Sequence, residues 1–405
     1  MKNTPNLYDT LFQILGQHAH WLDVRHLHTL VWMMVGLIKS KTISLPEWAT
    51  FVDSRAKFAQ STVRRFSRWI HNERIKTYKL YGPIIQEVLL EWGQNTIYLA
   101  LDTTMLWDQF CHIRISVIYR GRAIPLVWKT IEHNSSTVAL KDYQDLLDAA
   151  AKLLPSGANI IFLADRGFAD TKLMKYLSEK LHWHWRIRIK SSFYVYRRNQ
   201  RRTKISSIKQ KREQAHIWHN VYITGKMYGV LHLALAKPHG TKESWFIVSD
   251  QPTDLSTFDE YGLRFDIEEN FLDDKSGGFQ IESSLFRSAY AVSRLYLVLA
   301  IATLFLVSQG TEVVESNKRR WVDAHWFRGN SYLKIGWKWV LRAFVKGFDL
   351  ITQLFLSPLP DPEPAKASNK QEEKQKIKRV LSVQTEVYMP YVLKPARDSA
   401  IPSMN

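Results

Sequence analysis

Cysteine is almost absent from this sequence, since Cys111 is the only one among 405 residues. One cysteine cannot form a disulfide within the chain or a cysteine-based zinc site, which favours a reducing compartment. The apolar run from Leu295 to Val307 is too short for a membrane span and suits a buried helix. No apolar signal-peptide stretch follows Met1, and no G-x-x-x-x-G-K-[ST] nucleotide loop is present. We therefore expect a cytoplasmic protein rather than a membrane protein, and nothing supports an ATP-driven mechanism.

Positive charge is abundant by comparison. The chain has 56 lysines and arginines against 38 aspartates and glutamates, which gives a formal net charge of +18. Such an excess favours a polyanionic partner, because neutralising phosphates releases counterions. No basic amphipathic anchor or lipidation motif is present, so we expect DNA, and association with the nucleoid, rather than a membrane surface. The densest basic run, residues 197–212, supplies four candidate DNA contacts: Arg197, Arg198, Arg201 and Arg202.

The first part of the chain, residues 1–95, has apolar residues at helical intervals and predicts an α-helical domain. Within it, the stretch from Ser61 to Lys76 places Arg64, Arg68 and His71 on one side of a helix. This suits a helix that packs on a small bundle and presents a basic face to DNA. An ordinary solvated face explains the pattern equally well, and the segment has no helix-turn-helix glycine turn. Arg64 and Arg68 are the candidate DNA contacts here.

From residue 96 onward the pattern changes to strands. Apolar or alternating runs and two amphipathic helices predict the order strand, strand, strand, helix, strand, helix, strand. Three antiparallel strands, extended through helical crossovers, indicate an α/β fold with a ribonuclease H-like mixed sheet, spanning residues 96–357. Aromatic and β-branched runs at about 190–255 predict an inserted, mostly β subdomain. Alternating prolines and a Lys/Glu/Gln-rich run predict that residues 358–405 form a disordered tail.

Two aspartates follow short apolar strands. Asp102 comes directly after the run Ile97–Leu101, and Asp165 directly after the run Ile160–Ala164. In the predicted sheet these strands are adjacent and parallel, so both carboxylates would lie at one edge. A third carboxylate on a later helix would complete an all-oxygen site suited to Mg²⁺ or Mn²⁺. Two such ions, roughly 3.5–4 Å apart, can activate a nucleophile and stabilise the leaving oxygen of an in-line displacement.

The third carboxylate is Glu268, which belongs to the most informative pattern in the chain. Tyr261, Arg264, Glu268 and Lys275 fall within about 60° of one helical face, at about 100° per residue. An apolar stripe could hold this helix against a core and consists of Leu263, Ile267 and Phe271. One carboxylate flanked by an arginine, a lysine and a phenol suits binding of a metal ion beside a phosphate backbone.

These motifs resemble those of the DDE transposases of bacterial insertion sequences. More narrowly, they resemble the branch named for its Y-R-E-K signature (the insertion-sequence-four family). The resemblance covers roughly residues 96–310, including the β insertion. It rests on Asp102-Thr103-Thr104, on Asp165-Arg166-Gly167-Phe168 and on the spacing from Tyr261 to Lys275.

The resemblance implies a role for each of these positions. The catalytic, metal-binding triad would be Asp102, Asp165 and Glu268, with two Mg²⁺ or Mn²⁺ ions. Phosphates near the cut end would be contacted by Tyr261, Arg264 and Lys275. Trp245 would stack on a base flipped out of the element's end, although a tryptophan in a strand more often belongs to the core.

The function implied by the resemblance is metal-dependent cut-and-paste transposition of DNA. The steps would be nicking at the element's end, a hairpin intermediate and strand transfer into target DNA. The DNA partners would be terminal inverted repeats and the target, and pairing of two ends implies at least a homodimer. Two alternatives stay open: a ribonuclease H-like nuclease or resolvase without strand transfer, and a non-catalytic DNA-binding protein derived from a transposase. The β insertion disfavours the first, and the presence of all three carboxylates disfavours the second.

Overall fold

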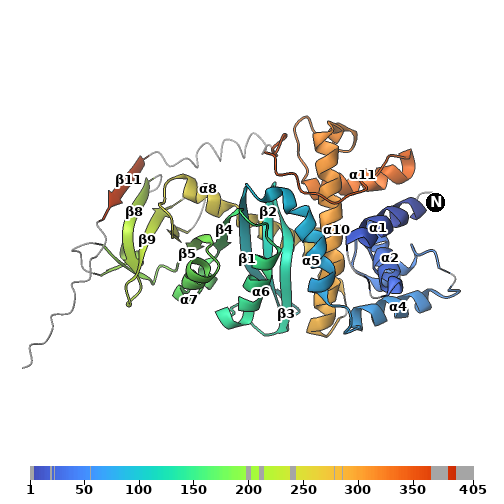
Figure 1. Cartoon of the computed structure of the whole chain (residues 1–405), viewed down its shortest axis with the longest axis horizontal. Helices are drawn as coiled ribbons and strands as arrows, with labels where there is room; N and C mark the ends of the chain where they lie inside the picture. The colour runs from blue at the N-terminus through green and yellow to red at the C-terminus, as the bar shows by residue number, and fades with distance from the viewer. Residues whose placement is uncertain are drawn as a thin grey trace, which may run out of the picture.

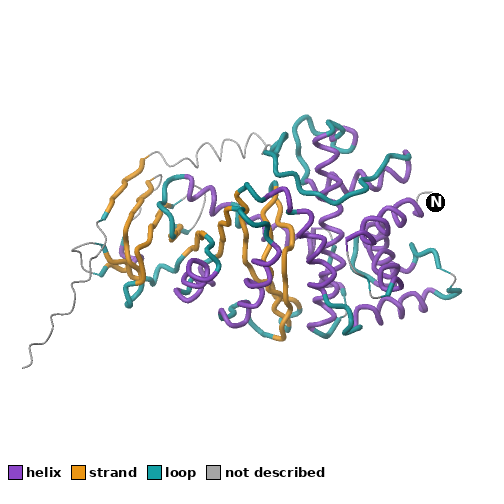
Figure 2. The backbone as a smooth tube through the Cα atoms, in the orientation of Figure 1, coloured by secondary structure: helices purple, strands orange, loops and turns teal. Residues whose placement is uncertain are grey.

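The computed structural model describes residues 4–18, 21, 23–54, 56–197, 202–208, 214–237, 243–277, 279–284, 286–365 and 382–388. Within these residues, eleven strands form one mixed sheet in the order β3-β2-β1-β4-β5-β10-β9-β8-β6-β7, with β11 beside β8. Figure 2 shows the strands gathered in one half of the molecule and most helices in the other. The predicted α/β class with a large mixed sheet is therefore confirmed.

The first five strands in chain order form the part of the sheet that carries the two aspartate motifs. β1, β2 and β3 are antiparallel, whereas β4 and β5 run parallel to β1. Their bounds are Thr96–Leu106, Phe110–Tyr119, Arg122–Glu132, Asn159–Ala164 and His184–Arg188. The crossover helices are α6 (Leu140–Leu153) and α7 (Thr171–Lys175), the latter continuing as a π-helical turn to Lys180. Every residue of β2 is buried, because helices cover both faces of this central strand.

The inserted strands continue the same sheet rather than forming a separate one. β10 pairs antiparallel with β5, and β9, β8, β6 and β7 follow it outward. Their bounds are Trp245–Ser249, Tyr228–Ala236, Gln214–Ile223, Tyr194–Tyr196 and Thr203–Lys204. The insertion is thus attached to the central sheet through β5, and Figure 1 shows it at the end farthest from the N-terminal helices.

A long central helix joins the sheet to the N-terminal helices. α10 (Ala289–Glu315) has 27 residues, and it is apolar and long enough to cross a membrane by length and composition alone. Yet 94% of its most apolar window is buried inside the protein. It packs against β3, α11 (Tyr332–Lys346) and several N-terminal helices. These N-terminal helices are α1 (Thr4–His18), α2 (Val24–Ser40), α3 (Leu45–Ala49), α4 (Ala59–His71) and α5 (Thr77–Val88).

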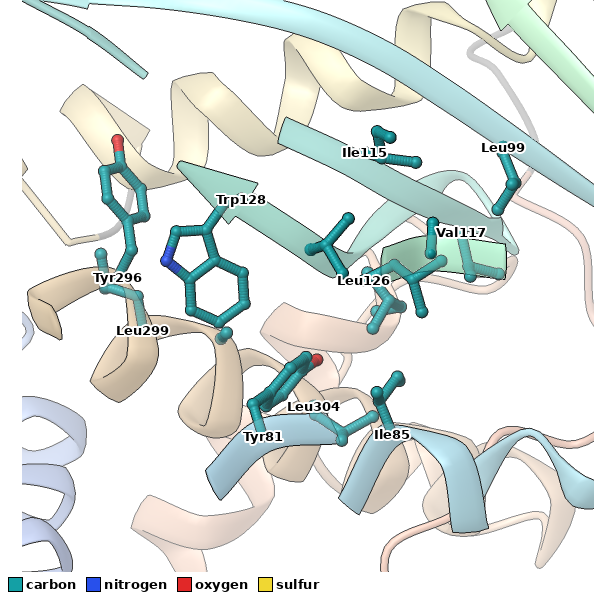
Figure 3. Close-up of a cluster of buried hydrophobic side chains, with 14 of the residues drawn as sticks. Tyr81, Ile85, Leu99, Ile115, Val117, Leu126, Trp128, Tyr296, Leu299 and Leu304 are labelled. Atoms are coloured by element: carbon teal, nitrogen blue, oxygen red, sulfur yellow. The ribbon is translucent and has the colours of Figure 1, made fainter. Parts of the chain in front are cut away.

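The main core lies between the sheet, α5 and α10. Figure 3 shows its side chains meeting from all three elements. The sheet contributes Leu99, Ile115, Val117, Leu126 and Trp128; α5 and α10 contribute Tyr81, Ile85, Tyr296, Leu299 and Leu304. Burial of this many apolar side chains fixes the position of the sheet relative to the helices.

Part of the segment 358–405, for which the composition predicts a disordered tail, is structured. Between the prolines, Asp361 accepts a hydrogen bond from Arg328 and Glu363 accepts one from Arg319. Farther on, β11 (Ser382–Val387) pairs in parallel with β8. The expectation of disorder is corrected for these parts because two buried arginines bind the acidic residues, and β8 offers an open edge to a β-prone hexapeptide.

Candidate catalytic site

Asp102 and Asp165 occupy neighbouring positions on parallel strands. The last residue pair between β1 and β4 is Leu101 with Ala164, and each aspartate is the next residue on its strand. The prediction that the strand ends at Asp102 is wrong, because β1 continues to Leu106 along β2. It is the parallel partner, β4, that ends at this level, and both carboxylates therefore lie where the parallel pairing stops.

Glu268 is brought to this point by α9 (Phe265–Leu272), which lies against β1, β2 and β3. Ile267 and Phe271 pack on Ala100 of β1 and on residues of the neighbouring strands. Because side chains alternate along a strand, Ala100 and Asp102 share a face. Asp102 therefore points toward the helix that carries Glu268.

The Y-R-E-K positions do not lie on one continuous helix as predicted. Tyr261 belongs to α8 (Ser256–Gly262), and Arg264 caps the start of α9. Lys275 lies in a π-helical turn, Asp273–Gly277, that follows α9. Tyr261 contacts the carboxylate of Asp165, Arg264 contacts those of Asp102 and Glu268, and Lys275 contacts β1.

Arg264 and Tyr261 connect to the carboxylates directly. Arg264 donates through Nη1 to Asp102 at 3.2 Å and through Nη2 to Glu268 at 2.5 Å. The hydroxyl of Tyr261 donates to Oδ1 of Asp165 at 3.3 Å. Tyr261 and Arg264 are both buried, so their polar groups face the carboxylates rather than solvent.

The electrostatic environment makes ionisation of Asp102 harder than it is in water. Burial raises the pKa of Asp102 to about 6, and the nearby charges of Glu268 and Asp165 add to the rise, while Arg264 and the backbone N–H of Thr103 oppose it. Burial also raises the pKa of the Tyr261 hydroxyl, which keeps this group a hydrogen-bond donor. Such a site stabilises an added positive charge, because it holds several negative groups in a partly dehydrated place.

The carboxylate oxygens at this site are the type of ligand that a hard divalent cation prefers. Asp102 and Asp165 offer oxygen ligands at neighbouring strand positions, and their side chains keep 18% and 31% exposure, so they can be reached from solvent. Among the described residues, no three His, Cys, Asp or Glu side chains are grouped closely enough to hold a metal ion. In this structure the carboxylate of Glu268 is bound by Arg264. The two aspartates fit the predicted metal, and Glu268 joins them only if its contact with Arg264 changes.

Two further predicted residues border the site. Lys275 donates to the carbonyl of Met105 in β1 at 2.8 Å and lies 3.1 Å from the carboxylate of Glu282. The Trp245 ring stands edge-on to Tyr261, with centroids 5.4 Å apart, and lies 5.7 Å from Phe265. Trp245 is therefore next to the residues that contact the carboxylates.

The remaining predicted DNA contacts lie away from the carboxylates. Arg64 and Arg68 are exposed on α4. Arg197 is largely covered, since it stacks on Trp218 and lies 3.6 Å from Glu386 of β11. Arg202 is exposed and stacks on Tyr194, whereas Arg198 and Arg201 lie outside the described residues.

Two arginines of β5 were not singled out from the sequence. Arg188 lies 3.9 Å from Asp165 and 2.7 Å from Glu243, and Arg186 binds Glu260 at 2.8 Å. Their signal in the sequence is the alternation of arginine with apolar residues in H-W-R-I-R, which is unusual for a strand buried on both faces.

One family model matches part of the chain. Residues 108–305 match the family model described as "Transposase DDE domain". The matched range begins after Asp102 and contains Asp165, Glu268 and the whole β insertion. It supports a DDE transposase. No curated protein matches the chain.

Two solved structures are similar at low identity. One is a piggyBac transposase synaptic complex with hairpin DNA: 12% identity, 93% of this chain, 89% of that chain and a TM-score of 0.45. The other is the Argonaute of Marinitoga piezophila with a 5′ OH guide RNA and target DNA: 10% identity, 54% of this chain, 33% of that chain and a TM-score of 0.21. Both TM-scores are below 0.5, and we base no conclusion on either.

Proposed function

We propose that this protein is a DNA transposase of the Y-R-E-K branch (the insertion-sequence-four family), with a ribonuclease H-like catalytic core. The observation that carries the proposal is the position of Asp102 and Asp165 at the end of the parallel ladder, with Arg264 linking Asp102 to Glu268. The strand order β3-β2-β1-β4-β5, with three antiparallel strands and then two parallel ones, supports the proposed core. Residues 1–95 would form a separate DNA-binding domain.

The reaction would be metal-dependent cut-and-paste transposition. Asp102, Asp165 and Glu268 would hold Mg²⁺ or Mn²⁺, two ions in the full site, which activate the attacking oxygen and stabilise the leaving oxygen. Water would nick the element's end, and the freed 3′-OH would attack the opposite strand to give a hairpin. After the hairpin is reopened, the same 3′-OH would attack target DNA. One site can serve each step because each is an in-line phosphoryl transfer.

The neighbouring residues hold the carboxylates in this scheme. Tyr261 orients Asp165 through its hydroxyl, and Arg264 neutralises Asp102 and Glu268 before DNA arrives. A phosphate contact by Arg264 then requires the guanidinium to exchange a carboxylate for a phosphate, which is the same type of charge-assisted bond. Lys275, with 26% of its side chain exposed, can reach a phosphate with less rearrangement.

The partners would be the element's terminal inverted repeats and target DNA, bound by a homodimer in the cytoplasm at the nucleoid. The net charge of +18 supports the DNA partner. Joining of two ends at one target requires two active sites, which supports the dimer.

Strand transfer is the activity that separates this function from its alternatives. Purified protein would be incubated with uncleaved and with pre-cleaved duplexes that carry the element's terminal sequence, a supercoiled target plasmid and Mg²⁺ or Mn²⁺. A transposase gives end–plasmid joints that require the metal. Cleavage without joints would identify a nuclease or resolvase, and binding without either product would identify a non-catalytic DNA-binding protein.

A further inference from the structure

A row of basic side chains winds along the exposed surface of α11. Lys334, Lys338, Arg342 and Lys346 follow each other at intervals of four residues, and all four are exposed. None of the 15 residues of α11 is acidic. Residues four apart are offset by about 40° around a helix, so the row extends about 18 Å along the axis, at about 1.5 Å per residue, and turns through about 120°. This length matches about five base pairs of one DNA strand at 3.4 Å each.

The charge at the start of the row acts on the segment that follows the helix of the third carboxylate. Burial raises the pKa of Asp273, at the end of α9, while Arg122 and Lys334 oppose that rise through their positive charge. Lys334 therefore contributes positive charge to the segment that follows Glu268. The row leads away from there along α11, which Figure 1 shows beside α10.

A loop with exposed aromatic side chains accompanies the row. Trp326 is 79% exposed, Phe327 59% and Trp321 50%. Exposure of three large aromatic side chains within one short segment is unusual unless they contact a ligand or a partner. Arg342 of the basic row donates a hydrogen bond to the carbonyl of Trp321, which attaches the loop to α11. Arg320 lies over the ring of Trp326, 4.7 Å from its centroid.

Hydrogen bonds to and from buried side chains hold the backbone of this loop in place. The fully buried carboxylate of Asp323 accepts hydrogen bonds from Arg319, His325, Asn330 and the backbone N–H of Gly329. Arg319 also donates to the carbonyl of Trp326 at 3.0 Å. The aromatic side chains therefore project from a fixed backbone, which lowers the entropy lost when they bind.

We infer that α11 and the loop 319–330 form a DNA-binding surface, in which the basic row follows the phosphate backbone and Trp326 and Phe327 stack on or wedge between bases. The inference rests on the proposed function and extends it to a second surface. A cationic row beside exposed aromatic rings is an arrangement that suits unstacked or bent DNA. An aromatic patch that binds protein would not require an uninterrupted row of cations without an acid. The duplex is either the DNA that flanks the element or the target DNA, since both present the same backbone.

The inference is tested by DNA binding measured without metal, by fluorescence anisotropy over a range of salt concentrations. Lys338→Ala/Lys346→Ala removes two cations of the row. Lys141→Ala/Lys152→Ala removes two exposed lysines of α6, a helix that also carries three aspartates, and serves as the charge-matched control. Trp326→Ala tests the aromatic contact. All five side chains are exposed, and thermal unfolding checks that each variant is folded.

We expect the row variant to bind roughly 10- to 100-fold more weakly at 150 mM salt, with the slope of log K against log salt reduced by about 2. Trp326→Ala weakens binding to a mismatched or kinked duplex roughly 5- to 100-fold and leaves the slope unchanged. The control keeps wild-type binding. A row variant that binds like the control overturns the inference, as does a Trp326→Ala variant that changes only the oligomeric state.

Two arms separate the sources of DNA. An end duplex with 20 bp of flank is compared with a pre-cleaved end that lacks it, and target plasmid is measured separately. Loss confined to the flanked duplex assigns the surface to the flank, and loss confined to the plasmid assigns it to the target. These binding assays need no catalysis. If the row variant binds DNA more weakly but the wild-type protein neither cuts nor joins DNA, the proposed function is contradicted and this inference stands. If the wild-type protein cuts DNA normally and the row variant binds DNA as well as wild type, this inference is contradicted and the proposed function stands.

Discussion

The guanidinium of Arg264 lies 3.2 Å from the carboxylate of Asp102. The arginine is buried between α9 and β1, and its second amino group binds Glu268. The positive charge at the centre of the site is therefore supplied by the protein itself. A catalytic role for the carboxylates requires that this ion pair weaken as DNA and the divalent cation bind.

Removal of Arg264 leaves Asp102 partly buried without its counter-charge. The pKa of Asp102 is already raised to about 6, so its ionisation makes the folded state less stable as pH rises from about 4 to 6. Without Arg264 this loss grows and extends to higher pH. We expect Arg264→Met to lower the free energy of unfolding by about 1–3 kcal/mol at pH 8 and by clearly less at pH 5.

Urea unfolding at the two pH values measures this difference. Arg68→Met, at an exposed position on α4, is the control and should change stability little at either pH. Equal losses at pH 5 and pH 8 for Arg264→Met would show that the arginine acts through packing alone.

The crossing of α10 and α11 depends on two glycines. A Cβ atom added at Gly310 would lie 2.0 Å from the carbonyl oxygen of Tyr332, and one added at Gly336 would lie 1.8 Å from that of Leu306. Neither helix can yield without moving apart, so Gly310→Ala or Gly336→Ala should destabilise the protein by about 1–3 kcal/mol or more.

Denaturant titration tests this prediction against Gly262→Ala, because a Cβ at Gly262 meets nothing within 4 Å. The control should be neutral or slightly stabilising, since alanine favours helix over glycine by about 1 kcal/mol. If Gly336→Ala were as stable as the control, the close approach of the two helices would not exist in solution.

The position of Trp245 is compatible with two roles, packing against Tyr261 and stacking on a DNA base. We expect Trp245→Ala to slow hairpin formation by roughly 5- to 100-fold, because stacking of one base contributes about 1–3 kcal/mol, and to slow the first nick much less. Trp245→Phe should retain part of the activity. Both steps are followed on denaturing gels, and an equal loss at both would indicate that the ring only supports Tyr261, 5.4 Å away.

The sequence indicates on which elements the three carboxylates lie, because short runs of apolar residues next to them identify those elements. An apolar run before each aspartate indicates a strand end region, and the stripe of Ile267 and Phe271 correctly indicates the buried side of the Glu268 helix. The extension of β1 beyond Asp102 was not predictable, because pairing with β2 decides it and the residues involved are more polar.

Contacts between residues far apart in the sequence could not be predicted from local patterns either. The bond from Arg264 to Asp102 joins residues 162 positions apart, and no local periodicity indicates which strand residue the arginine meets. The pairing of β11 with β8 joins residues far apart in the chain. Composition averaged over the segment predicts disorder and overlooks one hexapeptide that an open sheet edge can bind.

The most direct test of the catalytic assignment is single-turnover nicking of a labelled duplex that carries the element's end, with Mg²⁺ or Mn²⁺. Asp102→Asn, Asp165→Asn and Glu268→Gln should each reduce the nicking rate by at least about 100-fold, because loss of one ligand weakens binding of the ions that stabilise the transferring phosphoryl group. Glu269→Gln, an exposed neighbour on the same helix, should remain within about twofold of wild type. Wild-type nicking by any of the three variants, or loss of nicking in Glu269→Gln, would contradict the assignment.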